Sequence, residues 1–512
     1  MHIYIEKALL AFPVDTKGSL TKLMFKNEDG AYVYECDLRP AAGESNFTAY
    51  LDVRRFIGKE IDIVSEDGRA FTCTAVDEID RADMYGEPYR PYYHFTERNG
   101  WHNDPNGLVK DGTGMYHMYF QFNPADTDWG NMHWGHAVSR DMLRWTEKDI
   151  AMFPDGKGMM YSGSGYLDSE GLAGFGKDAL LFYYTAAGGM TLRSKDVPYT
   201  QCLAYSTDNG MTLRKYGTVI DYVVPGNRDP KIVRCDEMNG FVIPLYLTDD
   251  EYALYLSEDL LHWCEFQRLH LPGDNECPDL YPLTADDGTR RWVFSGAAGY
   301  YITGEFVDGC FVTDGVVRHM HADGPVPAGT PHSMYAAQTY SALPDGRRIN
   351  VPWEEILFPG DTPFRSQMGL PTEHTLVKGP DGYRLQADAA REAQTLRVRA
   401  YDTAFGRFTA PEPALEMILR APYEGKCNVS LFGEELVYEN GYASFGGRRI
   451  RVTEDNGTAR LHLYRDVASL EIYAGEKYDC FAADPDKNGG EVQWTGCEAE
   501  AYALENIFRA SR

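Results

Sequence analysis

The apolar positions of this chain fall in short runs that alternate with polar residues or are rich in aromatic side chains. Glycine, aspartate, asparagine and proline bound most of these runs, and such residues favour turns. The pattern is typical of β-strands joined by short loops. Long helical periodicity is scarce, so we expect an all-β protein. The clearest strands are predicted over residues 115–122, 180–185, 241–247, 292–295 and 349–353.

A weak internal repeat divides the middle of the chain. At Ser139, Ser206 and Ser257 a predicted strand is followed by Ser-x-Asp and then by an apolar residue. The spacing is close to the roughly 40–50 residues of a β-propeller blade, allowing for insertions. A blade is a four-stranded sheet that cannot bury its faces alone, and repetition around an axis solves this problem. At that period, residues 91–378 hold five blades.

The segments on either side of this region have a different pattern. Residues 1–86 contain short predicted strands and end in a polar stretch, residues 77–91, that is typical of a linker. Residues 393–512 contain further strands separated by glycine and asparagine turns. We expect each flank to be a small β-sandwich. The predicted fold is therefore a five-bladed β-propeller flanked by an N-terminal and a C-terminal β-sandwich.

Composition narrows the possible partners. The chain has 512 residues, of which 49 are basic and 77 acidic, for a formal net charge of −28. Such a chain repels phosphate backbones and anionic headgroups, so we expect neither nucleic acid nor membranes as partners. No apolar run approaches the roughly 18 residues of a membrane-spanning helix. The first residues lack a signal-peptide pattern, which favours a cytoplasmic protein, or a secreted one if the chain was trimmed.

The ten cysteines are scattered singly along the chain. None forms a Cys-x-x-Cys pair of the kind that binds zinc or acts as a redox couple. Together with the expected cytoplasmic location, this spacing predicts that all ten are reduced thiols.

Three carboxylates stand in contexts that indicate chemistry. Asp104, Asp229 and Glu276 are each followed by proline within two residues. Proline fixes φ and lacks a backbone donor, so an acid beside it tends to lie at a chain bend. Each acid precedes a predicted blade-opening strand, and such positions converge on the central channel of a propeller. Each motif alone is equally typical of a turn, but three in register with three blades favour one shared site.

A pair of carboxylates is the typical catalytic machinery of glycoside hydrolysis. One protonates the leaving oxygen, and the other attacks the sugar or activates water. A third acid can bind sugar hydroxyls and favour the positive charge that develops at the anomeric carbon. Trp101, Trp129 and Trp353 offer apolar faces to a sugar ring. This reaction needs no metal and no cofactor, so we expect neither.

Seven motifs then follow one another in a specific order. They are WHNDPNG (101–107), YFQFNP (119–124), WGNMHWGHAVS (129–139), YSGS (161–164), RDPK (228–231), ECPDL (276–280) and YAAQT (335–339). In these motifs the chain resembles glycoside hydrolase family 32, the invertases, levanases and inulinases. The resemblance implies a five-bladed propeller followed by a β-sandwich, in agreement with the repeat.

The resemblance also implies a role for individual residues. Asp104 corresponds to the nucleophile, Glu276 to the general acid/base and Asp229 to the transition-state stabiliser of a retaining double displacement. Positions that line the fructose pocket correspond to Asn103, Gln121, Trp129, Tyr161, Ser162, Arg228 and Trp353.

The leading prediction is therefore a retaining exo-acting β-fructosidase that hydrolyses terminal fructosyl linkages of levan, inulin or sucrose-type oligosaccharides. Its partner is then a fructose-containing oligo- or polysaccharide, and the sequence does not indicate an oligomeric state. A fructosyltransferase with the same three acids is an alternative. A non-catalytic fructan-binding protein is another, although loss of one acid is expected for it. The N-terminal sandwich is a candidate carbohydrate-binding module, with a platform drawn from Tyr32, Tyr34, Phe47 and Tyr50, although core positions are more typical of such residues.

Overall fold

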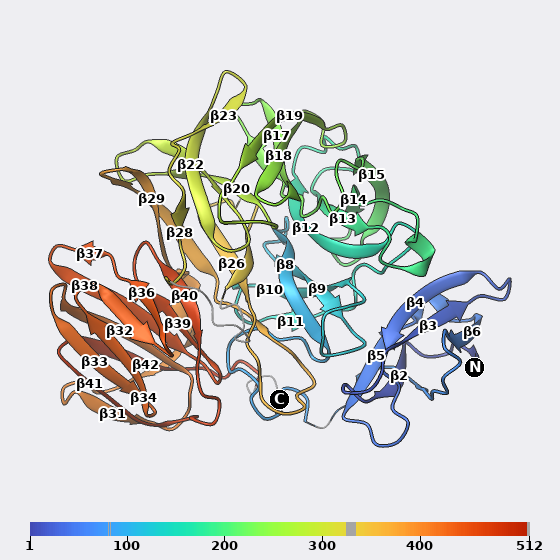
Figure 1. Cartoon of the computed structure of the whole chain (residues 1–512), viewed down its shortest axis with the longest axis horizontal. Coiled ribbons are helices and arrows are strands. Elements are labelled where there is room, and N and C mark those ends of the chain that lie inside the picture. Colours follow the sequence, from blue (N-terminus) through green and yellow to red (C-terminus); the bar gives the residue numbers. More distant parts are fainter. Residues whose placement is uncertain (80, 82, 324–333, 342, 509–512) are drawn as a thin grey trace.

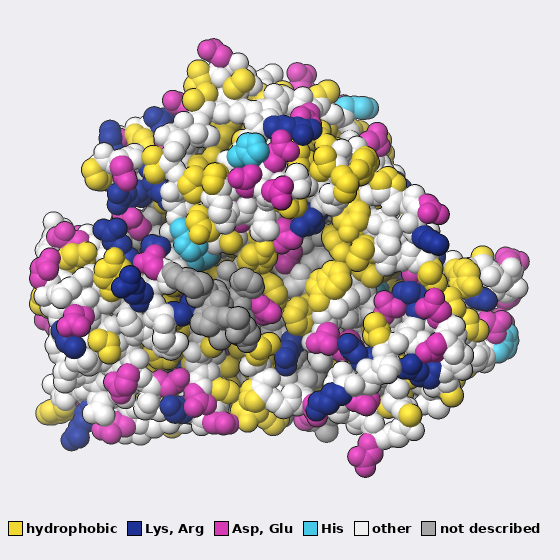
Figure 2. Space-filling view, viewed as in Figure 1, with side chains coloured by type: hydrophobic (Ala, Val, Ile, Leu, Met, Phe, Trp, Pro, Cys, Tyr) yellow, Lys and Arg dark blue, Asp and Glu magenta, His cyan; other side chains and the backbone are white. Residues whose placement is uncertain are grey.

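The computed structural model describes residues 1–79, 81, 83–323, 334–341 and 343–508. Antiparallel sheets dominate these residues, so the predicted all-β fold is confirmed. Within the described ranges, no helix is long and apolar enough to cross a membrane. Acidic and basic side chains are interspersed over the face drawn in Figure 2. The helices in the described residues are short 3₁₀ turns: η1 (Arg54–Phe56), η2 (Leu192–Ser194) and η3 (Arg391–Leu396).

The central region is the predicted five-bladed propeller (Figure 1). Blade 1 contains β8 (Trp101–Lys110), β9 (Tyr116–Asn123), β10 (His133–Ser139) and β11 (Thr146–Glu147). Blade 2 contains β12 (Met159–Asp168), β13 (Ala179–Ala187), β14 (Thr200–Ser206) and β15 (Arg214–Ile220). Blade 3 contains β16 (Val233–Cys235), β17 (Gly240–Thr248), β18 (Glu251–Ser257) and β19 (Cys264–His270).

The last two blades each carry one additional short strand. Blade 4 contains β20 (Asp279–Thr284), β21 (Arg290–Ser295), β22 (Tyr300–Val307) and β23 (Cys310–Thr313), with β24 (Arg318–His319) beside β22. Blade 5 contains β25 (Tyr335–Thr339), β26 (Arg348–Glu354), β28 (Thr372–Gly379) and β29 (Gly382–Ala389), with β27 (Gln367–Met368) beside β26.

The five apolar runs noted in the sequence are the second strands of the five blades, namely β9, β13, β17, β21 and β26. Most of their residues are buried, because each blade has a neighbour on both faces. A separate apolar cluster lies between each pair of neighbouring blades, including the fifth and the first. Strand β8 contacts both β12 and β25, so the ring of blades is closed.

The Ser-x-Asp repeat is the turn between the third and fourth strands of the first three blades. The serine hydroxyl donates to the aspartate two residues later, over 2.9 Å at Ser139, 2.6 Å at Ser206 and 3.2 Å at Ser257. Each aspartate then accepts backbone N–H groups from the residues that follow. The repeated sequence is therefore a repeated Asx-type turn.

Two small sheets form the N-terminal sandwich, and they enclose a core of their own. One sheet is β1 (His2–Tyr4), β6 (Glu60–Ser65), β3 (Thr21–Lys26) and β4 (Tyr32–Leu38). The other is β5 (Phe47–Asp52), β2 (Leu9–Val14) and β7 (Thr74–Val76). Tyr34 and Phe47 are buried in this core, whereas Tyr32 is exposed. These aromatic residues do not share one exposed sugar platform.

Two larger sheets form the C-terminal sandwich, on another side of the propeller from the N-terminal sandwich (Figure 1). One sheet is β30 (Arg397–Ala400), β42 (Glu498–Leu504), β32 (Leu415–Pro422), β38 (Thr458–Arg465), β39 (Ser469–Tyr473) and β40 (Tyr478–Ala482), with β37 (Glu454–Asp455) beside β38. The other is β31 (Arg407–Ala410), β41 (Gly490–Thr495), β33 (Lys426–Leu431), β34 (Glu434–Glu439), β35 (Tyr442–Phe445) and β36 (Arg448–Arg451).

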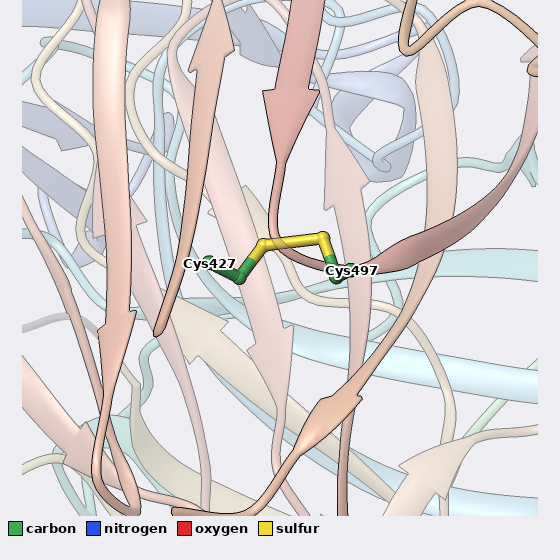
Figure 3. The surroundings of a disulfide bond; sticks show 2 residues. All are labelled: Cys427 and Cys497. Carbon is green, nitrogen blue, oxygen red and sulfur yellow. A yellow bond between two sulfur atoms is a disulfide. The ribbon is translucent and has the colours of Figure 1, made fainter. Parts of the chain in front are cut away.

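The prediction that all ten cysteines are thiols is wrong for one pair. Cys427 and Cys497 form a disulfide in the C-terminal sandwich (Figure 3). The two residues are 70 positions apart, but β33 pairs with β41, and their Cα atoms lie 5.6 Å apart. That separation suits a disulfide. The isolated spacing of the cysteines carried no information about this sheet pairing, and the cellular location stays a prediction.

Removal of this disulfide is expected to destabilise the C-terminal sandwich. A bridge that closes a loop of this length typically contributes about 2–4 kcal/mol, largely by restricting the unfolded chain. Cys427→Ser with Cys497→Ser should lower the midpoint of thermal unfolding measured by calorimetry, and reduction of the parent should have the same effect. The matched control is the exposed thiol variant Cys310→Ser, which should unfold like the parent. A parent that yields ten free thiols on unfolding without reductant would contradict the bridge.

Candidate active site

One cavity of about 400 Å³ brings all ten predicted site residues together. Its volume lies in the range of small-molecule sites. Two further tyrosines, Tyr199 and Tyr335, complete the lining. The predicted residues in the lining are Asn103, Asp104, Gln121, Trp129, Tyr161, Ser162, Arg228, Asp229, Glu276 and Trp353.

The three acids come from three blades. Asp229 precedes β16 and Glu276 precedes β20, as expected. The expectation that Asp104 also precedes a strand is wrong, because Asp104 lies within β8. The pairing of β8 with β9 shifts register between His102 and Pro105. Such a bulge re-aims side chains, so the acid reaches the cavity from inside a strand.

Two neutral groups hold the Asp104 carboxylate. Ser162 Oγ donates to Oδ2 over 2.6 Å, and Asn103 Nδ2 donates to Oδ1 over 3.0 Å. Trp101 Nε1 in turn donates to Asn103 Oδ1 over 2.9 Å. Burial raises the pKa of Asp104, these two hydrogen bonds lower it, and the negative charge of Glu276 raises it, with a net upward shift. The carboxylate is therefore fixed in position but only partly stabilised in its charged form.

The other two acids sit on unusual backbone. Asp229 has φ +65° and Glu276 has φ +56°, in the left-handed region that side chains other than glycine rarely adopt. Such conformations cost about 1–3 kcal/mol each and persist where the surroundings enforce them. The Asp229 N–H donates to Thr185 Oγ1 over 3.0 Å, and the Cys277 N–H donates to Asp229 Oδ2 over 3.2 Å. Neighbouring blades therefore support the strained turns.

Arg228 joins the second and third acids. Its Nη2 donates to Glu276 Oε1, and its Nε lies 3.6 Å from Asp229 Oδ2. The guanidinium also lies over the ring of Tyr246, 4.5 Å from its centre. Tyr335 OH donates to the other oxygen of Glu276 over 2.8 Å. Both oxygens of Glu276 are thus held, by one cation and one phenol.

Asp229 is the most perturbed of the three acids. Burial raises its pKa most, the Arg228 charge lowers it, and Glu276 and Asp104 raise it again, so that the pKa reaches about 7. Three carboxyl groups sharing one cavity oppose simultaneous ionisation. Strongly shifted carboxyl groups in a cavity are a physical mark of a functional site.

Aromatic rings form two walls of the cavity. On one side Tyr161 meets Trp129 edge-on at 6.1 Å and Tyr199 edge-on at 5.7 Å, measured between ring centres. On the other side Trp353 meets Trp101 edge-on at 5.9 Å. Trp353 Nε1 donates to Ser366 Oγ over 2.9 Å. The cavity therefore combines charged groups with apolar ring faces, a combination that suits a sugar.

One cluster of possible metal ligands lies outside the cavity. Among the described residues, His94, Glu354 and Glu471 are buried together where the propeller meets the C-terminal sandwich. Burial lowers the pKa of His94, but its hydrogen bond to Asp466 and the Glu471 carboxylate 3.6 Å away outweigh this effect and raise the pKa to about 10. Burial also raises the pKa of Glu354, and the charge of Glu471 adds to this. Protons on His94 and Glu354 therefore reduce the net negative charge that is buried at this junction.

The sequence comparison identifies the family. Residues 94–386, more than half of the chain, match the model of the glycosyl hydrolases family 32 N-terminal domain. The chain belongs to family 32. This range holds all ten predicted site residues, and the resemblance stated from the motifs is confirmed.

Curated relatives and one solved structure extend the comparison. The levanase of Bacillus subtilis is 33% identical over 353 residues, which are 64% of this chain and half of that protein's length. The extracellular exo-inulinase of Aspergillus ficuum is 29% identical over 422 residues, 72% of this chain and 74% of that protein. A family 32 structure from Bifidobacterium adolescentis, 18% identical, covers 99% of this chain and 100% of its own with a TM-score of 0.68. Its likeness extends the shared fold to nearly the whole chain.

Three residues at or beside the cavity have no role predicted from the motifs. Tyr335 begins the motif at 335–339, but its bond to Glu276 depends on the fold. Cys277 follows Glu276, and its Sγ lies 3.5 Å from Asp104 Oδ2 and 3.6 Å from Asp229 Oδ2. Tyr199 stands in a loop before β14 without a motif around it. Only its ring contact with Tyr161 indicates that it belongs to the site.

Replacement of Asp229 is expected to stabilise the fold above neutral pH. Between the ordinary value of 3.8 and about 7, the unfolded chain is ionised at this position while the folded protein keeps the proton. Stability therefore falls as pH rises through this window. Asp229→Asn removes the buried charge, and asparagine tolerates positive φ. We expect its thermal midpoint to exceed that of the parent by a few degrees at pH 8 and by less at pH 4, measured by calorimetry.

The matched control has the opposite sign. Burial raises the pKa of Asp208, but hydrogen bonds from Ser206 and Thr212 outweigh it and lower the pKa. Ionised Asp208 therefore stabilises the fold above the ordinary aspartate pKa, and this contribution is lost as pH falls. Asp208→Asn should lower the thermal midpoint at pH 8. Equal losses in both variants at pH 8 would contradict the strained, desolvated state assigned to Asp229.

Proposed function

We propose that this family 32 chain is a retaining exo-acting β-fructosidase that hydrolyses terminal fructosyl linkages of fructans or sucrose-type oligosaccharides. The observation that carries the proposal is the meeting of Asp104, Asp229 and Glu276, from three blades, in one aromatic-walled cavity. The names of the levanase and exo-inulinase relatives support a fructan as the substrate. A fructose-containing saccharide is thus the proposed partner.

In the first step, an oxygen of Asp104 attacks the anomeric carbon of the terminal fructosyl unit. Glu276 donates its proton to the glycosidic oxygen, the bond to that oxygen breaks, and the shortened saccharide leaves. The fructosyl unit is now esterified to Asp104. The hydrogen bond from Ser162 supports this role, because it orients Asp104 Oδ2 and leaves the carboxylate little freedom.

In the second step, Glu276 takes a proton from water as the water oxygen attacks the anomeric carbon. Fructose leaves with its configuration retained, and Asp104 returns to a carboxylate. The contacts of Arg228 and Tyr335 support Glu276 as the group that exchanges the proton, because they hold both of its oxygens beside the cavity. No metal and no cofactor enters this proposed reaction.

Asp229 is the proposed stabiliser of the transition state. Positive charge develops at the anomeric carbon and ring oxygen as the bond breaks, and a fixed buried carboxylate favours that charge. Arg228 beside it favours the ionised form of Asp229, because the guanidinium opposes the upward shift of its pKa, so Asp229 serves as a carboxylate above a pKa of about 7. The aromatic walls leave a cavity sized for a small ligand, which supports action at a chain end.

The first expected outcome concerns products. Timed digestion of sucrose, inulin and levan, with every released sugar resolved by chromatography, should give free fructose as the early product. Asp104→Ala should lower the rate by about 10³-fold or more, because it removes the nucleophile. The matched control is Asp308→Asn, at an exposed turn position with φ +49°, which should keep the parent rate.

Other product patterns would redirect the function. Longer oligosaccharides or cyclic dianhydrides at early times would indicate fructosyl transfer, and internal fragments would indicate endo cleavage. Binding of fructan without turnover by the parent would support the binding-protein alternative.

The second expected outcome concerns stereochemistry. A covalent intermediate requires two inversions, so fructose should be released first as its β-anomer. NMR spectra recorded during the first minutes of sucrose hydrolysis identify the anomer that is released first. In methanol-containing buffer, methyl β-fructofuranoside should form as a second product. Initial release of the α-anomer would rule out the double displacement at Asp104.

A further inference from the structure

The loop between β9 and β10 carries Trp129 and packs into the N-terminal sandwich. Ala125 in this loop is fully buried and belongs to the hydrophobic core of that domain. Asp126, also buried, pairs with Arg39 of the N-terminal domain. The same guanidinium lies 3.3 Å from the carboxylate of Asp128. The segment just before Trp129 is therefore anchored outside the propeller.

The segment just after Trp129 is anchored on β4, two residues before Arg39. Asn131 Oδ1 accepts the Asp37 N–H over 2.7 Å, and Asn131 Nδ2 donates to the Asp37 carbonyl over 2.8 Å. Asn131 thus satisfies both backbone groups of one residue of β4. Its own backbone has φ +46°, a conformation that asparagine tolerates better than most residues. Both sides of the Trp129 loop are bound to residues 37–39.

A second loop of the propeller is bound to the same strand. The connection between β13 and β14 contains η2 and leads to Tyr199. Glu35 Oε1 accepts the Leu192 N–H over 2.6 Å, and Arg193 Nη1 donates to the Val33 carbonyl over 3.1 Å. In Figure 1, β4 lies on the side of the N-terminal domain that faces the propeller. One strand therefore holds both loops.

These two loops supply the outer rings of one wall of the cavity. Trp129 and Tyr199 flank Tyr161, and each meets it edge-on. Trp129 is 49% exposed, so packing covers only about half of its surface. Its position therefore depends strongly on how its backbone is anchored. Ordering of a binding wall before the ligand arrives lowers the cost of binding.

We propose that strand β4 of the N-terminal sandwich, with the residue that follows it, positions the aromatic wall of the substrate cavity, through Glu35, the Asp37 backbone and Arg39. These are positioning residues, because they act through the loops and have no contact with the proposed reacting groups. The inference rests on the proposed function for its substrate, a fructosyl unit whose apolar face packs against the wall. It gives the N-terminal domain a role in binding affinity while the three acids retain the chemistry.

The kinetic test uses the full chain and two substitutions, one on β4 (Glu35) and one directly after it (Arg39). Glu35→Leu removes the acceptor of the Leu192 N–H, and Arg39→Met removes the partner of Asp126. Each should raise KM for sucrose and levan roughly three- to tenfold, because the loop that carries the wall loses one or two of the hydrogen bonds that hold it in place. The value of kcat should stay within about twofold of the parent, and the pH profile of kcat should not move. Glu35→Gln keeps the acceptor oxygen and should restore the parent KM.

The matched control separates positioning from stability. Arg69→Met removes an arginine of the same domain that pairs with Asp67 and donates to the Ser19 carbonyl. It should lower the thermal midpoint without changing KM. An unchanged KM in Glu35→Leu and Arg39→Met, with a lowered thermal midpoint, would overturn the inference and reduce the interface to a structural one.

A second measurement does not depend on turnover. The acrylamide quenching of Trp129 fluorescence is obtained by comparing each protein with its Trp129→Phe counterpart. Loss of the β4 contacts should raise the quenching constant of Trp129, whereas Arg69→Met should leave it unchanged. If the parent hydrolyses no fructose-containing sugar, the proposed function fails, and quenching alone decides whether β4 holds the loop. Parent-like quenching in Glu35→Leu and Arg39→Met would overturn the positioning role.

Discussion

Closure of the ring of blades is the constraint on which the rest of the structure depends. Each blade is apolar on both faces along its second strand, so its apolar surface is fully buried only when it has a neighbour on each side. The contact of β8 with both β12 and β25 completes this arrangement. Closure also turns residues distant in sequence into neighbours at the axis. The three acids meet because the hydrophobic effect acts between blades.

The site uses the rigidity that closure provides. Asp229 and Glu276 occupy left-handed backbone, and each hydrogen bond that supports them joins different blades, as from Asp229 to Thr185 and from Tyr335 to Glu276. Local sequence alone does not favour these turns. The surrounding sheets hold them, and part of the stability of the propeller thereby offsets the strain of a site with three crowded carboxyl groups.

Sequence patterns predicted the features that repeat or that belong to a motif. The apolar second strands and the Ser-x-Asp turns indicated blades, and the proline-flanked acids indicated a shared site. Features that depend on contacts across the fold were not predictable. Cys427 and Cys497 carry no pairing signal until β33 and β41 are paired. Tyr199 has no motif around it, and the bonds of Asn131 to Asp37 join two domains. The bulge that carries Asp104 into the cavity within β8 also arises from strand register, which the turn-forming residues around it do not specify.

The two-faced apolar second strands have a consequence for synthesis of the chain. Blade 1 is the first of the blades to leave the ribosome, but the face that it turns toward blade 5 stays uncovered until β25 and β26 have been made. Until then, the nascent chain exposes an apolar sheet surface that other chains can bind. The interface between the first and last blades is thus the last one of the ring that can be buried. The first blade therefore stays open to association with other chains for the time needed to translate the remaining four.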